Sequence, residues 1–220
     1  MTDLLVIFLK WPEPGKVKTR LGKDLGYQKS AEIYKFLVST VIKRISPMMD
    51  DSNTICWCFD PNYREMEIKN WIQFELDNLN INNIKDQIFW PQSSGNLGER
   101  LKSVFNKFFE EGFQKIIAIG TDCILINDIL IKGAFELLDL DNDIVFGPCL
   151  DGGYYLIGIK NFKSCVVFEE IPWSTDRVLN SSLRKAEKYN LRYMLLKELF
   201  DVDTIKDFNK LGIEISDFES

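Results

Sequence analysis

Histidine is absent from this 220-residue sequence. Without imidazole, the chain cannot build a Ser-His-Asp triad, a histidine-ligated zinc site or a histidine acid-base pair. Any chemistry must therefore come from carboxylates, lysine, arginine, tyrosine or cysteine. Cysteine is also scarce, odd in number and without a doubled C-x-x-C spacing, which favours reduced, packed thiols over disulfides or metal ligands. The five residues are Cys56, Cys58, Cys123, Cys149 and Cys165.

The sequence also lacks an excess of positive charge and a long apolar run. Its net charge of −6 argues against general binding to the phosphate backbone of nucleic acid, so any basic site must be local. No apolar run approaches the length of a transmembrane helix. Because the first residues enter an apolar segment without a preceding basic region, we expect a cytoplasmic protein with no membrane span.

Apolar runs and helical patterns alternate along the chain without an internal repeat, a low-complexity tract or a clear linker. This alternation predicts an α/β protein, with a single three-layer α/β/α domain over residues 1–220 and a mostly parallel central sheet. The expected strands are 4–9, 54–59, 86–90, 116–120, 144–146, the run after Gly153, and 192–196. The expected helices are 27–45, 63–76, a segment ending near 112, 128–138, a segment through 178–186 capped by Ser174 or Thr175, and a short terminal helix.

The segment after the first expected strand is rich in cations for an acidic chain. Lys10, Lys16, Lys18 and Arg20 lie close together, with Gly15 among them. Lysine and arginine supply charge to phosphate groups, and glycine allows the backbone to approach them closely. This segment is therefore a candidate binding loop for nucleotide phosphates, and the alternative is a solvated basic loop.

A second candidate is the carboxylate at the end of the buried run 115–119. This run ends abruptly in Gly120, Thr121 and Asp122. In open α/β sheets, ligands bind outside the carboxyl ends of the strands, so Asp122 is a candidate metal ligand. The alternative is that Asp122 caps the helix expected to begin near Asn127, or closes a turn.

Two other expected strands end in polar segments. Gln92, Gly95 and Asn96 follow the third expected strand and could present amide and backbone groups to a base or a sugar, although a helix-capping loop has the same composition. Asp151 lies in a tight Asp-Gly-Gly turn before a strand that returns to the sheet. This turn also lies at a central strand exit, where a substrate is expected.

Asp201 and Asp203 follow the last expected strand. Because the carboxyl ends of parallel strands meet at one edge of a sheet, we expect the basic loop, Asp122, Asp151 and this pair to line one cleft. Aspartate oxygens suit Mg²⁺ or Mn²⁺, and such an ion bridges diphosphate oxygens. The sequence therefore predicts carboxylates that hold a divalent metal and cations that hold phosphates.

Five motifs occur in order along the chain. They are Phe8-x-Lys10-x-Pro12-x-Pro14-Gly15-x-Val17-Lys18-Thr19-Arg20-Leu21, Gly95-x-Leu97-Gly98-Glu99-Arg100-Leu101, Gly120-Thr121-Asp122-Cys123, Gly147-Pro148-x-x-Asp151-Gly152-Gly153-Tyr154-Tyr155 and Asp201-Val202-Asp203-Thr204. With these motifs the whole chain resembles the bacterial family DUF2064, also called radical-SAM/selenodomain-associated transferase 1. The resemblance implies the GT-A fold of nucleotide-diphospho-sugar transferases, with kinship to guanylyltransferases of cofactor biosynthesis.

The resemblance also implies roles for individual residues. The nucleotide-phosphate clamp of the family matches Lys10, Lys18 and Arg20. Its metal-binding aspartate after the central strand matches Asp122, and the distal metal ligand would be Asp203 or Asp201.

The expected function is a divalent-metal-dependent, glycosyltransferase-like enzyme that uses a nucleotide sugar and an unknown acceptor. The alternative is a guanylyltransferase-like nucleotidyltransferase acting on a nucleoside triphosphate and a phosphorylated acceptor, because one carboxylate, Asp122, stands where glycosyltransferases commonly carry an Asp-x-Asp pair. A second alternative is a catalytically silent nucleotide-binding module, because Ile124 stands where the family usually has proline. The candidate catalytic residues are Lys18 and Asp151, of which Asp151 would position or deprotonate the acceptor.

Overall fold

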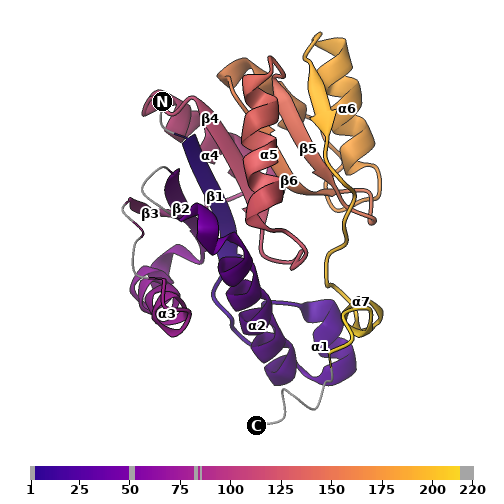
Figure 1. Cartoon of the computed structure of the whole chain (residues 1–220). Helices are drawn as coiled ribbons and strands as arrows, with labels where there is room; N and C mark the ends of the chain where they lie inside the picture. Colours follow the sequence, from indigo (N-terminus) through magenta and orange to yellow (C-terminus); the bar gives the residue numbers. More distant parts are fainter. Residues whose placement is uncertain (1–2, 50–52, 82–83, 85, 214–220) are drawn as a thin grey trace.

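A seven-stranded sheet forms the centre of the molecule (Figure 1). The computed structural model describes residues 3–49, 53–81, 84 and 86–213. Within them the strand order is β3-β2-β1-β4-β6-β5-β7. The strands are β1 (Asp3–Lys10), β2 (Asn53–Asp60), β3 (Gln87–Pro91), β4 (Lys115–Gly120), β5 (Ile144–Pro148), β6 (Tyr154–Ile159) and β7 (Tyr193–Leu195). Each strand expected from the sequence is present.

Strand β6 runs against its neighbours, and the other strands run in one direction. β1 pairs in parallel with β2 and β4, β2 with β3, and β5 with β7. β6 pairs antiparallel with both β4 and β5. The sheet is therefore mostly parallel, as predicted, and the β5–β6 pair confirms the strand expected to return after the Asp151 turn. The carboxyl ends of β1 and β4 consequently lie side by side.

Helices cover both faces of the sheet, which confirms the three-layer prediction (Figure 1). Because side chains alternate along a strand, Leu5 and Ile7 of β1 pack on one face and Leu4 and Val6 on the other. The first face carries α1 (Thr19–Leu25), α2 (Tyr27–Ile45), α3 (Glu65–Asn78), α5 (Asp128–Asp139) and α7 (Ile205–Asn209). The second carries α4 (Leu97–Glu110), α6 (Val178–Lys188) and the 3-10 helix η3 (Phe162–Phe168). Among the described residues there are also two shorter 3-10 turns, η1 (Ser46–Met48) and η2 (Asn62–Arg64). In the described part of the chain, no helix has the length and apolar character that crossing a membrane requires.

Helices α1 and η3 were not predicted, nor was the short turn η1. Helix α1 begins at Thr19, within the basic segment, so that Arg20 lies on a helix. Helix η3 follows β6 and begins after Asn161, whose side chain caps it by accepting a hydrogen bond from the Ser164 N–H. Both segments are short, and so neither has enough turns to establish a helical spacing of apolar residues.

The predicted cap of α6 by Ser174 or Thr175 is wrong. The helix begins after Arg177, which makes no side-chain capping bond. The Thr175 hydroxyl instead donates to the Pro172 carbonyl at 2.7 Å and accepts from the Arg177 N–H at 3.3 Å. The hydroxyl therefore closes a turn before the helix, an alternative that threonine commonly adopts.

Candidate nucleotide and metal site

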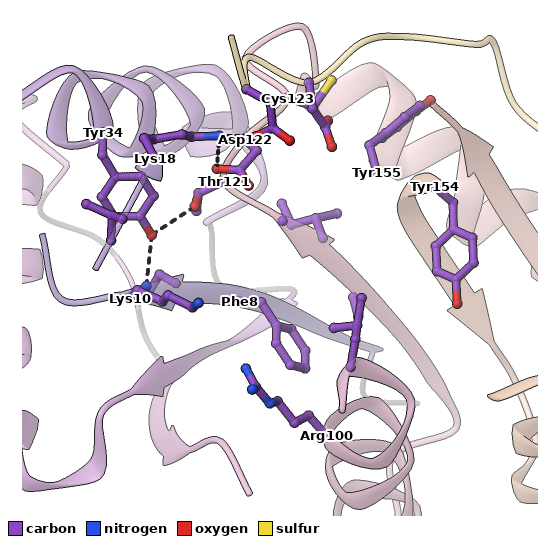
Figure 2. Close-up of a pocket in the computed structure, with 18 of the residues that line it drawn as sticks. Phe8, Lys10, Lys18, Tyr34, Arg100, Thr121, Asp122, Cys123, Tyr154 and Tyr155 are labelled. Atoms are coloured by element: carbon purple, nitrogen blue, oxygen red, sulfur yellow. Dashed lines mark hydrogen bonds and ion pairs between the residues drawn. The ribbon is translucent and has the colours of Figure 1, made fainter. Parts of the chain in front are cut away.

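A cavity of about 460 Å³ opens where β1 and β4 end (Figure 2). Its walls include seven residues predicted for the site, namely Lys10, Lys18, Arg20, Gln92, Asp122, Asp201 and Asp203. Four other predicted residues, Gly15, Gly95, Asn96 and Asp151, are not among the residues that line it. The fold therefore places the basic segment, the end of β4 and the two C-terminal aspartates around one space.

Lys18 joins the charged groups of this cavity. Its backbone has a φ of 45°, a left-handed conformation that is uncommon for residues other than glycine, and its side chain is 3% exposed. The Nζ atom lies 2.7 Å from Asp122 Oδ1 and 3.0 Å from Asp203 Oδ1. Burial alone would lower the pKa of Lys18, but the charges of these two carboxylates outweigh it and raise the pKa above its usual value. Lys18 is thus a buried, charged ammonium.

Asp122 follows β4 and presents its carboxylate to Lys18 (Figure 2). The side-chain cap of α5 is Asn127, which accepts a hydrogen bond from the Leu130 N–H at 3.0 Å. The interpretation of Asp122 as the cap of that helix is therefore wrong. Its backbone carbonyl accepts a hydrogen bond from the Val202 N–H at 2.9 Å, which fixes the C-terminal aspartates beside the end of β4.

Asp201 contributes a buried carboxylate oxygen. Its Oδ1 atom has no hydrogen-bond partner among the described residues. Burial, followed by the nearby charge of Asp122, raises the pKa of Asp201 to about 7. Ligand atoms of Asp201, Asp151 and Cys149 lie within 4.8 Å of one another. Burial also raises the pKa of the Cys149 thiol, so that the carboxylates are the stronger cation ligands of this group.

Asp151 reaches this group from the β5–β6 turn. Its side chain is exposed, and its Oδ1 atom accepts a hydrogen bond from the Gly153 N–H at 2.8 Å. Gly152 has a φ of 86°, and a Cβ atom at that position would collide with the backbone of Asp176. The turn therefore requires glycine, and it holds Asp151 next to Asp201 at the edge of the cavity.

The Gln92 side chain is used within the protein. Its Nε2 atom donates to the carbonyls of Leu9 at 3.1 Å and Cys58 at 3.0 Å. Its Oε1 atom accepts from Arg100 Nη1 at 3.3 Å. The side chain therefore ties the ends of β1 and β2 to the first turn of α4.

Asn96 caps α4. Its Oδ1 atom accepts from the Glu99 N–H at 3.1 Å, and Glu99 Oε2 accepts from the Asn96 N–H at 2.7 Å, which completes a capping box. Gly95 has a φ of 107°, and a Cβ atom there would collide with the Glu99 carboxylate. The structure thus gives this loop the helix-capping arrangement that the sequence left open.

No sequence pattern marks Tyr34 as a residue of the site. Its hydroxyl accepts a hydrogen bond from the Lys10 N–H at 2.8 Å and lies 3.2 Å from Thr121 Oγ1 (Figure 2). Burial, followed by the charge of Asp122, raises the pKa of Tyr34 to about 12. Tyr34 lies on the apolar face of α2, so its spacing matches that of a core residue. Arg100, Tyr154 and Tyr155 also line the cavity without having been selected as site residues.

The fold matches that of solved nucleotide-diphospho-sugar transferases and related synthetases. A protein of Desulfovibrio desulfuricans G20 assigned to the former class is 30% identical, with a TM-score of 0.82, over 95% of this chain and 85% of that chain. CMP:2-keto-3-deoxy-manno-octonic acid synthetase complexed with CTP is 12% identical, with a TM-score of 0.52, over 96% of this chain and 97% of that chain. Rv0371c of Mycobacterium tuberculosis H37Rv, in complex with manganese, is 11% identical, with a TM-score of 0.52, over 95% of this chain and 96% of that chain.

The comparison with curated proteins found no match. A family model described as "Uncharacterized protein conserved in bacteria (DUF2064)" matches residues 66–175, which is half of the chain. This match agrees with the resemblance drawn from the five motifs. The chain belongs to the DUF2064 family.

Proposed function

We propose that this protein is a divalent-metal-dependent transferase that binds a nucleotide sugar and transfers the sugar to an acceptor. The observation that carries the proposal is the buried Lys18 ammonium between Asp122 and Asp203, in a cavity that Lys16 and Arg20 also line. Cations supply the charge that a diphosphate group needs, and carboxylates supply ligands for the metal that accompanies it. The 30% identical relative assigned to the nucleotide-diphospho-sugar transferases favours a sugar donor.

The carboxylates fit a divalent cation. Asp201 Oδ1 is buried without a hydrogen-bond partner, and an oxygen in that state is stabilised by a cation. Asp122, Asp201 and Asp203 would hold Mg²⁺ or Mn²⁺, with Asp151 close enough to Asp201 to take part. The manganese complex of a protein with the same fold supports this assignment. When bound, the ion would neutralise charge on the diphosphate leaving group.

The protein's own side chains have separate parts in the proposed reaction. Lys10, Lys18 and Arg20 bind the phosphates, and Lys18 stabilises the charge that collects on the departing nucleoside diphosphate. Asp151 lies on the exposed side of the carboxylate group, where it would orient the acceptor hydroxyl and take its proton. The acceptor oxygen then forms a bond to the anomeric carbon as the bond to the diphosphate breaks.

Nucleotidyl transfer is the second candidate, because β4 ends in Thr121 and Asp122 and so supplies one carboxylate. The synthetase that was solved with CTP shares this fold, which supports the candidate. In this reaction a phosphorylated acceptor attacks the α-phosphorus of a nucleoside triphosphate and pyrophosphate leaves. The same clamp and the same carboxylates would serve both reactions.

Calorimetry with Mn²⁺ and a panel of nucleoside triphosphates and nucleotide sugars tests the proposal, and product analysis separates the two candidates. Release of a nucleoside diphosphate supports sugar transfer, and release of pyrophosphate supports nucleotidyl transfer. Asp122→Ala should abolish metal-dependent binding, whereas Glu110→Gln, an exposed carboxylate change on α4, should leave it unchanged. Binding without turnover would favour the silent module, and absence of all binding would exclude every version of the proposal.

A further inference from the structure

Arg100 lines the cavity from the first turn of α4 (Figure 2). Two hydrogen bonds hold its guanidinium in place. The Nε atom donates to the Gly95 carbonyl at 3.0 Å, and Nη1 donates to Gln92 Oε1 at 3.3 Å. Gln92 cannot rotate freely, because its Nε2 atom donates to two carbonyls at the ends of β1 and β2. The direction in which Arg100 points is therefore fixed before any ligand binds.

The hydrogen-bonding capacity of Arg100 is only partly used. A guanidinium has five N–H donors, and the two bonds to Gly95 and Gln92 use two of them. In the part of the chain that the structure describes, no carboxylate forms an ion pair with Arg100. The guanidinium of Arg100 is therefore charged and fixed in position, and it has free N–H donors. In this cavity it favours a ligand that carries several hydrogen-bond acceptors.

Apolar side chains form part of the wall of the cavity that Arg100 lines. The cavity walls include Phe8, Leu97, Leu101, Ala118 and Ile157. Leu97 is 46% exposed although it begins a helix whose apolar face is buried. Apolar walls together with a fixed polar group suit a flat heterocycle better than a free phosphate. The cations proposed to bind the phosphates, Lys10, Lys18 and Arg20, line the same cavity.

We infer that Arg100 is a specificity-determining residue that binds the edge of a nucleobase with two adjacent hydrogen-bond acceptors. This inference rests on the proposed nucleotide-binding function. Guanine offers O6 and N7, and cytosine offers O2 and N3, to the parallel donors of a guanidinium. Adenine carries its amino group beside a ring-nitrogen acceptor, and uracil carries its N3–H between two carbonyl oxygens. In either base a hydrogen-bond donor would then face an N–H group of Arg100. The site therefore takes guanine or cytosine nucleotides and rejects adenine and uracil nucleotides.

Calorimetry on the full chain in the presence of Mn²⁺ tests this inference, with GTP, CTP, ATP, UTP and inorganic pyrophosphate as the probes. The unmodified protein should bind GTP or CTP at least about tenfold more tightly than ATP and UTP, which is the scale of one bidentate contact. Arg100→Met should remove this preference and leave the affinity for pyrophosphate unchanged. Arg100→Lys keeps the charge without the fork, so it should also lose the preference while preserving the fold.

Lys102→Met provides a matched control, because Lys102 lies on the same helix, pairs with Glu169 and does not line this cavity. It should change neither the preference nor the affinity. Three results would overturn the role of Arg100 and leave the proposed function standing. They are tighter binding of ATP or UTP, equal binding of all four nucleotides, and an Arg100→Met protein that loses as much affinity for pyrophosphate as for nucleotides. Failure of the unmodified protein to bind any of the five probes would overturn the proposed function together with this inference.

Discussion

Lys18 Nζ and Asp122 Oδ1 lie 2.7 Å apart, so the protein's own ammonium sits beside the carboxylate expected to bind a metal. The same ammonium contacts Asp203, and the two carboxylates remain 44% and 38% exposed. Lys18 therefore balances negative charge that would otherwise repel across the cavity. This arrangement keeps Asp122 and Asp203 close together before a divalent cation is bound.

Lys18→Met should destabilise the protein by about 1–3 kcal/mol, because it leaves two neighbouring carboxylates without a cation. The loss is smaller than for a fully buried ion pair, because both carboxylates are partly exposed to solvent. Denaturant unfolding in the presence of a chelator measures the loss. Mn²⁺ should then stabilise Lys18→Met more than the unmodified protein, since the ion supplies the missing charge. Lys23→Met, an exposed change on the helix α1 that follows Lys18, is the control. Equal stability of the two variants would contradict this role of Lys18.

The metal-free protein should lose stability through Asp201 as the pH rises. The pKa of Asp201 is about 7 in the folded chain against an ordinary value of 3.8, so the folded state binds more protons than the unfolded state between these values. The contribution of Asp201 to the free energy of unfolding therefore falls as the pH rises from about 4 to 7, and it is constant above that range. Asp201→Asn should flatten this part of the profile.

Urea unfolding at a series of pH values, with a chelator present, measures the Asp201 effect. Other carboxylates also contribute to the pH dependence, so the informative quantity is the difference in slope between the unmodified protein and Asp201→Asn. Glu110→Gln should retain the original slope, because this side chain is exposed. Identical slopes in all three proteins would contradict the prediction, because they would mean that folding does not raise the pKa of Asp201.

Tyr34→Phe should destabilise the protein by about 1–3 kcal/mol, because it leaves the Lys10 N–H without its acceptor and removes the contact with Thr121. It should also weaken nucleotide binding, since the ends of β1 and β4 lose the link that the Tyr34 hydroxyl makes between Lys10 and Thr121. Thermal unfolding and calorimetry measure the two effects. Tyr63→Phe, at a side chain that is 74% exposed, should change neither the stability nor the nucleotide affinity. A Tyr34→Phe protein with the same stability and affinity as Tyr63→Phe would disprove the linking role of Tyr34.

Local patterns were sufficient to predict the central elements. The apolar run 116–119 predicted the buried strand β4, and the spacing of apolar residues along 27–45 predicted α2 with those bounds. These predictions succeeded because hydrophobic periodicity within one segment determines which face is buried. Short segments such as α1 and η3 were missed for the same reason, since a few residues carry too little periodicity.

The sequence by itself also determined the chemical character of the site. Without histidine, and with cations after β1 and aspartates after β4 and β7, it restricted the chemistry to carboxylates and cations that suit a metal and phosphates. The strand-exit argument placed these groups along one edge, because parallel strands end on the same side of a sheet.

The tertiary structure alone decided how those groups pair and which polar side chains remain free. Lys18 is separated from Asp203 by 185 residues, and no local pattern specifies such a contact. Gln92 and Asn96 were selected for polarity, yet their side chains are used by β-strand carbonyls and by the α4 cap. Arg100 keeps free donors instead, because hydrogen-bond saturation depends on every neighbour in space and the sequence records only neighbours along the chain.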